Sequence, residues 1–421
     1  MNYDEAQKKV CQLIEDRREE IIQTLRKLVS IPSVVGQEGA CQKYLAGLYY
    51  SLGMKVTEFV ADHDKVSRHK AFSESGISYE GRPNIIGTLE GDPSARSLKL
   101  NGHVDVVSPE PVAEWDCDPW EGKLEGNRLY GRGAWDMKAG LIANYFALKT
   151  ILDAGFKPKG TVMLESVIEE EVGGGGGALA CLIEGFTADG LFIPEPNMQV
   201  TVATPGIYYF RVNVMGKTAH AGRAHIGVNA IGKMNRIYDA LVDLDEKRAR
   251  ENHYPLFEQD SERSCHLNFG IYSAGDWAST VAGWAELKCR LSLIPGEKYE
   301  DVKNQVHKTI NEAARRDEWL REHPPGITWF GWQSEPWEQD PNHPFVTTFK
   351  CCADKTLGAN TKIIGVTWGL DTRFAQYFNI PALTFGPAGA NIHGVNEYVE
   401  VDSFIDCTKV ISSFIMEWCG V

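Results

Sequence analysis

The chain has 421 residues, more than one typical domain holds, so two or three domains are expected. Its composition, 43% hydrophobic and 24% charged, is that of a globular protein with a large core. A formal net charge of -14 argues against a nucleic-acid partner or an anionic membrane surface. There is no signal-like or membrane-length apolar run, and the 10 cysteines include no CxxC pair. We therefore expect a cytoplasmic chain with reduced thiols.

The first half of the chain alternates helix-like and strand-like segments. Helices are predicted at 1–26, 40–52, 135–152 and 178–184, and strands at 55–60, 84–89, 98–101, 160–167 and 190–193. A second α/β stretch follows near the end, with a helix at 344–357 and strands at 361–365 and 381–385. Such alternation predicts an α/β domain built on a mainly parallel sheet, with helices on both faces.

The segment between these stretches has another pattern. Strands are predicted at 207–215, 266–272, 285–294 and 327–333, and helices at 227–244 and 299–315. The order β-α-β-β-α-β predicts an inserted α+β sandwich of helices on an antiparallel sheet, as in ferredoxin-like folds. The predicted organisation is therefore 1–205 and 339–421 for one domain and 206–338 for the insert.

Five short motifs carry histidines or acidic residues, and most follow a strand-like run. They are GHVD at 102–105, GRGAWDMK at 131–138, EEEVG at 169–173, IPEP at 193–196 and IHGVNE at 392–397. Strand ends and the loops after them form the binding crevice of an open α/β sheet. Imidazoles with carboxylates are the ligands that borderline divalent metals prefer. We therefore predict two metal ions side by side that activate a water molecule.

Each motif also has an ordinary interpretation. His103 and Asp105 project to the same side of an extended segment. One could bind a metal while the other forms a hydrogen bond with the far nitrogen of the histidine ring, or the two could be a polar pair in a turn. Asp136 could bridge two cations or simply cap a helix. Glu195 is held rigidly between two prolines, which suits a ligand.

The remaining acidic positions are open in the same way. Glu169, Glu170 and Glu171 could be a solvated run, although a buried strand precedes them and glycines follow. His393 and Glu397 could be a loop histidine and a solvated acid. Arg132 and Lys138 receive no role. The glycine run 173–177 suits close approach of the backbone to a neighbour.

In this order, the motifs resemble those of the di-zinc aminoacylases, acetylornithine deacetylases, succinyl-diaminopimelate desuccinylases and related carboxypeptidases. The similarity extends through GKTAHAG at 216–222 and GVNA at 227–230 of the insert. The resemblance implies two divalent metal ions, most often zinc, with cobalt or manganese as alternatives. It also implies an insert that acts as a lid and dimerisation domain.

The resemblance implies roles for matched positions. The implied metal ligands are His103 and Glu195 for one ion, Glu171 and His393 for the other, and Asp136 for both. Asp105 would stand behind a ligand, Glu170 would be the general base, and His220 would reach the active site of a partner subunit. Arg290, or alternatively Arg373, would bind a substrate carboxylate.

Three departures from the family pattern leave the substrate open. STVA at 279–282 stands where many relatives carry Asn-x-Val-Pro, His225 stands where many carry proline, and Arg373 competes with Arg290. The predicted function is hydrolysis of the amide bond of an N-acyl amino-acid-like small molecule. The alternatives are a dipeptidase or carboxypeptidase, a hydrolase of a non-peptide C–N bond on an aromatic substrate, and a non-catalytic metal-binding relative.

A homodimer is predicted from the insert. One face of 207–215, and of the helix after Gly227, is apolar enough to require a partner, and a two-fold pair of inserts would supply it.

Overall fold

A computed structural model describes residues 3–259 and 261–421. The chain forms two compact units. The first holds the residues up to Val202, Gln339–Ile364 and Leu370–Val421, and the second holds Ala203–Glu338 and Gly365–Gly369. The sequence predicts an insert at 206–338, and the short stretch 365–369 lies outside that range. That the second unit works as a lid domain stays a prediction.

The first unit is built on a mixed sheet. Its strands, in spatial order, are β1 (Lys55–Phe59), β2 (Asn84–Leu89), β6 (Val162–Val167), β3 (Leu98–His103), β7 (Leu191–Ile193), β15 (Ala382–Thr384) and β8 (Val200–Thr204). Neighbours from β6 to β15 are parallel, whereas β1, β2 and β8 pair antiparallel. The α/β class is confirmed, and the four central strands pair in parallel. Strand β8, which the sequence analysis did not predict, also pairs with β14 (Ile363–Gly365).

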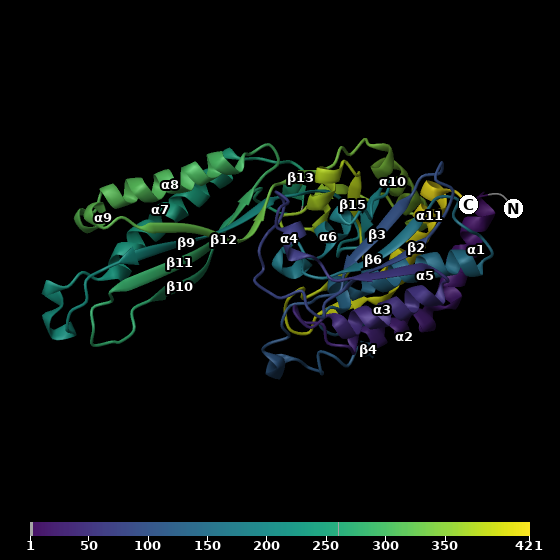
Figure 1. Cartoon of the computed structure of the whole chain (residues 1–421), viewed down its shortest axis with the longest axis horizontal. Helices are drawn as coiled ribbons and strands as arrows, with labels where there is room; N and C mark the ends of the chain where they lie inside the picture. Colours follow the sequence, from purple (N-terminus) through teal and green to yellow (C-terminus); the bar gives the residue numbers. More distant parts are fainter. Residues whose placement is uncertain (1–2, 260) are drawn as a thin grey trace. The chain divides into compact units, whose positions relative to one another are not determined.

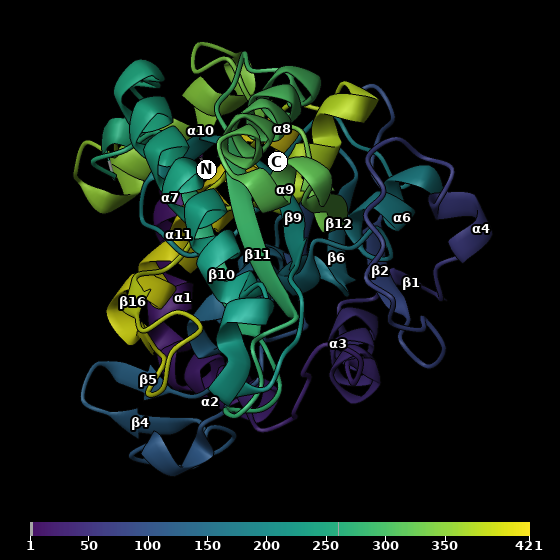
Figure 2. The ribbon, with the colours of Figure 1, turned by 90° about the vertical axis from the view of Figure 1, so that its left-hand side faces the viewer.

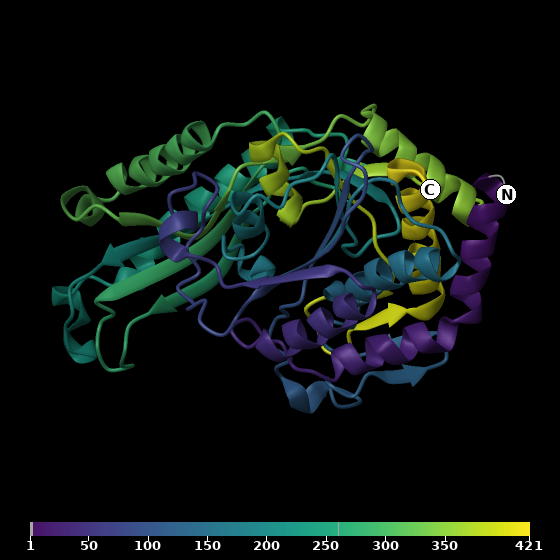
Figure 3. The ribbon, with the colours of Figure 1, turned by 45° about the vertical axis from the view of Figure 1, so that its right-hand side comes forward.

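The helices of this unit pack on the sheet and on one another. They are α1 (Tyr3–Asp16), α2 (Arg18–Val29), α3 (Gly39–Ser51), α4 (His63–Val66), α5 (Ala139–Asp153), α6 (Ala178–Ile183), α10 (Pro344–Leu357) and α11 (Val401–Cys419). Helix α5 consists mainly of small and apolar residues and is almost wholly buried, and α11, which was not predicted, packs along α5 and α1 (Figure 3). No helix in the described part of the chain is long and apolar enough to span a membrane.

The side chains of β3 alternate between two environments. A Cβ on Gly102 would lie 2.8 Å from Leu141 of α5, so this face of the strand lies against the helix. Residues two apart in a strand share a face, so Lys99, Asn101 and His103 lie on the opposite face. His103, the last of them, is thereby carried to the end of the strand while still buried.

A small second sheet was not predicted, and it connects two of the motifs. Its order is β16 (Gly389–Ala390), β17 (Tyr398–Glu400), β5 (Arg128–Tyr130) and β4 (Lys123–Glu125), and part of it is seen in Figure 2. Tyr398 of β17 lies opposite Tyr130 of β5, and Gly131 N donates to Glu397 O at 3.0 Å. The segments 131–138 and 392–397 are therefore held side by side, although they are far apart in sequence.

The second unit has the predicted β-α-β-β-α-β order. Its elements are β9 (Gly206–Met215), α7 (Ala230–Glu251), β10 (Leu267–Ala274), β11 (Trp284–Leu293), α8 (Tyr299–Arg315) and β12 (Gly326–Ser334), with a short α9 (Glu318–Glu322) and β13 (Trp337–Glu338). The sheet is antiparallel in the order β10-β11-β9-β12, and α7 and α8 lie along one face of it (Figure 1).

The prediction that the apolar face of 207–215 requires a partner chain is wrong. Strand β9 is internal, between β11 and β12, and its side chains Phe210, Val212 and Val214 are fully buried in a core shared with α7 and α8. Met215 at the end of β9 is exposed, as are Ile226 and Ile231 before and in α7. Other exposed large apolar side chains of this unit lie around the edge strand β10 and the segment after it. They include Ile271, Tyr272, Trp277 and Trp284.

A buried ion pair stabilises the second unit and can be tested directly. Arg248 of α7, 3% exposed, donates to both carboxylate oxygens of Glu297 at 2.9 Å and to Ser292 O at 3.1 Å. We predict that Arg248→Met lowers the free energy of unfolding by about 3 kcal/mol, because Glu297 loses its partner. Urea unfolding of the full chain measures this. The control is Arg250→Met on the same helix, whose side chain is 70% exposed and which should change stability by less than about 0.5 kcal/mol. Equal effects of the two substitutions would contradict the assignment.

Candidate metal centre

The five predicted ligands come from five segments of the first unit. His103 ends β3, Glu195 follows β7, and Glu171 lies in the turn η3 (Glu170–Val172) after β6. Asp136 lies in the distorted turn η2 (Ala134–Lys138) that leads into α5, and His393 lies between β16 and β17. Three of these positions follow parallel central strands, whose carboxyl ends share one edge of the sheet.

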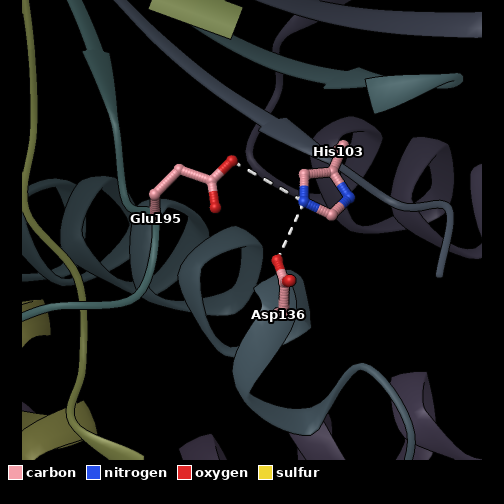
Figure 4. Close-up of side chains that lie close together, drawn as sticks. All are labelled: His103, Asp136 and Glu195. Carbon is pink, nitrogen blue, oxygen red and sulfur yellow. Dashed lines mark hydrogen bonds and ion pairs between the residues drawn. The ribbon is translucent and has the colours of Figure 1, made fainter. Parts of the chain in front are cut away.

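The structure brings the first group together around one point. His103 Nε2 lies 3.1 Å from Asp136 Oδ1 and 3.6 Å from Glu195 Oε1, and all three residues are buried (Figure 4). One ligand atom from each residue lies within 4.8 Å of the others. Two carboxylates and one imidazole nitrogen therefore face a common space.

A second group shares one member with the first. His393 Nε2 lies 2.8 Å from Glu171 Oε2 and 3.2 Å from Asp136 Oδ2. Again one ligand atom of each of the three residues lies within 4.8 Å of the others. Asp136 thus directs one oxygen to each group. The capping alternative for Asp136 is not supported, because the cap positions of η2 and α5 are Gly133 and Lys138 and both Asp136 oxygens face histidine nitrogens.

The orientation of His103 is set by a backbone group and not by a carboxylate. Its Nδ1 lies 2.9 Å from the main-chain oxygen of Asp105, whereas the Asp105 carboxylate is 3.8 Å away. A donating Nδ1–H leaves the lone pair on Nε2, the atom that faces the first group. The Asp105 carboxylate accepts instead from Glu170 N at 3.4 Å and Glu171 N at 3.1 Å. Asp105 therefore orders the acidic turn as well as the histidine.

Glu397 is a buried support of the site, so the interpretation as a solvated acid is wrong. It is 1% exposed, and its carboxylate accepts from the backbone N–H groups of Gly133, Trp135 and Asp136 at 3.0–3.1 Å. Arg132 donates to it at 2.6 Å. No role for Arg132 was predicted from the sequence. The only signal for this pair was that both residues lie inside motifs already marked as functional.

Lys138 is the other basic residue of the motif that was left without a role. It is fully buried, and its ammonium group donates to Leu28 O at 3.2 Å and Ile31 O at 2.9 Å. It therefore fastens the start of α5 to the end of α2. The contacts of this lysine in the described structure are those of a structural residue.

Burial, and after it the crowding of carboxylates, shifts the pKa values of the acidic groups in the centre. Burial raises the pKa of Glu195 well above its usual range, and burial together with Asp136 raises that of Glu171. Hydrogen bonds to Asp136 and Glu171 raise the pKa of His393 to about 10. Burial also raises the pKa of Asp105 to about 8. These directions are those of a site whose negative charge exceeds its fixed positive charge.

The residues fit divalent cations in two respects: the chemistry of their donor atoms, and a buried oxygen that has no hydrogen-bond partner. Two imidazole nitrogens and three carboxylates form a donor set that suits zinc, cobalt or manganese. Glu195 Oε1 is buried and has no hydrogen-bond partner among the residues that the structure describes. Buried polar atoms are normally paired, and such an atom is expected where a ligand or ion completes the site.

The three consecutive glutamates have three different environments. Glu171 belongs to the second group, and Glu170 beside it is 8% exposed, with Oε1 buried and without a hydrogen-bond partner in the described chain. Burial raises the pKa of Glu170 well above its usual range. Glu169 is fully buried and lies outside both groups. The interpretation of this run as a solvated face is therefore wrong.

The residues predicted to contact the substrate differ in exposure and in their partners. Arg373, in η6 (Asp371–Phe378), is 3% exposed and lies 3.7 Å from Asp371 Oδ1. Arg290 of β11, in the second unit, donates to Thr367 O at 3.4 Å. His220, also in the second unit, is exposed, and its Nδ1 accepts from Gly222 N at 3.1 Å, which keeps the proton of the neutral ring on Nε2.

Comparison with known proteins identifies the family. Residues 100–417 match the model of peptidase family M20/M25/M40. The chain belongs to this family and is a metallohydrolase. All five ligand positions lie inside the matched range.

Individual relatives differ in substrate. The chain is 29% identical to the N-formyl-4-amino-5-aminomethyl-2-methylpyrimidine deformylase of Bacillus subtilis (strain 168), over 97% of this chain and 96% of the relative. It is 29% identical to the acetylornithine deacetylase of Vibrio atlanticus (strain LGP32), over 83% of this chain and 89% of the relative. Its fold is similar to that of the YXEP protein of Bacillus subtilis, a dinuclear metal-binding peptidase of the M20 family. For that structure the TM-score is 0.63 and the identity 15%, over 95% and 98% of the two chains.

The support given by Glu397 leads to a prediction. Glu397→Gln removes the negative charge that faces Arg132. It also replaces one accepting oxygen by an NH₂ group, which would face the backbone N–H groups of the turn. We expect a loss of about 3 kcal/mol in stability, the usual cost of breaking a buried pair, and faster hydrogen exchange of the amides of 133–136. The control is Glu400→Gln, which lies nearby, is half-buried and should change neither quantity. Unchanged exchange at 133–136 in the Glu397 variant would show that this carboxylate does not hold the turn.

Proposed function

We propose that the chain hydrolyses the amide bond of an N-acylated amine at a centre of two divalent metal ions. The observation that carries the proposal is the position of Asp136, whose two oxygens are shared by two groups of three donors. We assign His103 and Glu195 to one ion, Glu171 and His393 to the other, and Asp136 to both. When bound, the ions would supply Lewis acidity and activation of a water nucleophile. The donor set favours zinc, with cobalt and manganese as alternatives.

Glu170 is assigned as the general base. It is adjacent to a ligand, buried, and has a carboxylate oxygen that the described protein does not engage. It would accept the proton of the attacking water and deliver it to the leaving nitrogen. Burial raises the pKa of Glu170 and so favours the first transfer, whereas the second transfer relies on the basicity of the leaving amine. Asp105, which holds the amides of this turn, would keep the base in place.

The substrate is the open part of the proposal. The first candidate is an N-acyl amino acid, the type of compound processed by the acetylornithine deacetylase relative. The second is the formamide of a heteroaromatic amine, because the deformylase relative aligns over nearly the whole of both chains. Arg290 and Arg373 would bind a carboxylate in the first case. In this structure Arg373 lies beside Asp371 and Arg290 contacts Thr367, so neither guanidinium stands apart from the protein's own groups.

A substrate panel tests the function. The zinc-loaded chain is assayed against N-acetylornithine, the N-formyl aminopyrimidine and a set of dipeptides, with chelator-treated protein as control. Glu170→Gln preserves shape and removes the base, so we predict a loss of about 10²–10⁴-fold in kcat on the substrate found, with unchanged metal content. Turnover within a few-fold of the unsubstituted chain would exclude Glu170 as the base. Full activity of rigorously metal-free protein would exclude the metal mechanism.

We further propose a homodimer formed through the second unit, with His220 acting in the site of the partner subunit. Support comes from the exposed apolar side chains at and after β10, which include Trp277 at 72% exposure, and from the edge position of that strand. The Nε2–H of an exposed His220 would be free to donate to the oxyanion of the substrate.

Complementation tests this arrangement. His220→Ala and Glu170→Gln chains should each lose nearly all activity alone. After subunit exchange, a mixed dimer holds one site of two with both residues intact, so a 1:1 mixture should regain about a quarter of the activity of the unsubstituted chain, as expected for isologous pairing. If labelled chains exchange and no activity returns, His220 does not act across the interface.

A cytoplasmic location is proposed as well. All ten cysteines are free thiols in the structure, and most are buried, which suits a reducing compartment. Cell fractionation should recover the chain with cytosolic markers, and recovery with membranes or in the medium would contradict the proposal.

A further inference from the structure

The first of the three glutamates, Glu169, is placed differently from its two neighbours. It is fully buried, and its backbone adopts a left-handed conformation with φ 72°. Such a conformation is uncommon for a residue with a side chain and persists where surrounding contacts impose it. Glu169 directly precedes the assigned base, Glu170, and the assigned ligand, Glu171. Whatever fixes Glu169 therefore also fixes where the next two side chains begin.

The Glu169 carboxylate is held from two directions. Ser75 Oγ donates to Oε1, and Gly176 N donates to Oε2 at 2.9 Å. The guanidinium of Arg82 lies 3.5 Å from Oε1. Arg82 is itself 2% exposed and makes two bonds of 2.7 Å to the carboxylate of Glu38. One buried cation thus joins Glu169 to a second fixed carboxylate.

The glycine run after the motif is shaped around this side chain. A Cβ on Gly174 would lie 2.2 Å from Glu169 Oε2, and a Cβ on Gly176 would lie 2.8 Å from the same atom. A Cβ on Gly177 would lie 2.0 Å from Ile168 O. The close approach that the sequence predicts for 173–177 is therefore an approach to the protein's own glutamate. Only glycine leaves room for the carboxylate at the first two positions.

The other side of the turn is fixed by Asp105. Its carboxylate accepts from the amides of Glu170 and Glu171, while Gly174 N returns a bond to Glu169 O at 3.0 Å. Hydrogen bonds to the Glu169 side chain fix the start of the turn, and hydrogen bonds to the Asp105 carboxylate fix its backbone. Neither Glu170 nor Glu171 has a hydrogen bond to its carboxylate from the loop 67–82, so the loop acts on them through Glu169 in the described structure.

We propose that Glu169 is a positioning residue, which, with Arg82 and Ser75, sets the base Glu170 and the ligand Glu171 in their working positions. The inference rests on the proposed function, because it gives these two residues their roles. A positioning role for Glu169 differs from a purely structural role in one measurable respect. A structural anchor would affect only the stability of the fold, whereas a positioning residue affects the affinity of the second metal position and kcat in a chain that is still folded.

The test compares Glu169→Gln with Glu74→Gln. Glu74 lies in the same loop region, is exposed and pairs with His63 at 2.8 Å, so it is a matched control. Three quantities are measured: zinc affinity by chelator competition, hydrogen exchange of the amides of 170–177 in metal-free protein, and kcat and KM separately. For Glu169→Gln we expect zinc affinity at the second position, that of Glu171 and His393, and kcat to fall by about 10–100-fold, with KM within about two-fold, and faster exchange at 170–177. Glu74→Gln should leave all of them unchanged.

Contrary outcomes are clear. If Glu169→Gln folds and keeps its zinc affinity, exchange rates and kcat, the proposal is overturned. If that variant does not fold, Ser75→Ala removes one hydrogen bond to the same carboxylate and should show the same pattern at about a tenfold effect. Failure of the proposed function would be seen separately, as an unsubstituted chain that binds no zinc. The exchange rates of metal-free protein would then still decide whether Glu169 orders the turn.

Discussion

The constraint on which the site depends is the sharing of one buried carboxylate, Asp136, by two groups of metal-binding side chains. Its oxygens lie 3.1 Å from His103 Nε2 and 3.2 Å from His393 Nε2. Glu171 and Glu195 are crowded around the same point. Buried like charges repel strongly unless cations are present, so this arrangement is costly for an empty site and favourable for a filled one. The surrounding structure has to hold these groups together against that repulsion.

Backbone amides and a few buried ion pairs supply that support. Glu397 accepts three amides of the Asp136 turn and pairs with Arg132, and the small sheet of β5 and β17 keeps these two segments adjacent. Asp105 and Glu169 do the same for the turn of Glu170 and Glu171. The turns that carry Asp136 and Glu171 are thus each held by carboxylates that do not themselves belong to a metal group. A charged acceptor is effective here because hydrogen bonds to charged groups are stronger than neutral ones.

Much of the fold and the residues that gather in the two donor groups could be predicted, because both depend on local patterns. Strand-like runs ending in His103, Glu171 and Glu195 indicated one edge of a sheet, and the alternation in the second unit indicated its β-α-β-β-α-β order. Features that depend on tertiary contacts could not be read in this way. The burial of Glu397 and Glu169, and the internal position of β9, follow from partners far away in sequence. Helix α11 is a different case, because its periodic apolar positions would have indicated it.

The central claim is that Asp136 joins two metal ions. The most direct measurement is anomalous X-ray diffraction from crystals of the zinc-loaded protein, with data on both sides of the zinc absorption edge. The account predicts two anomalous peaks, one bordered by His103, Asp136 and Glu195 and the other by Asp136, Glu171 and His393. Zinc peaks only elsewhere on the protein, or no peak in contact with Asp136, would contradict it.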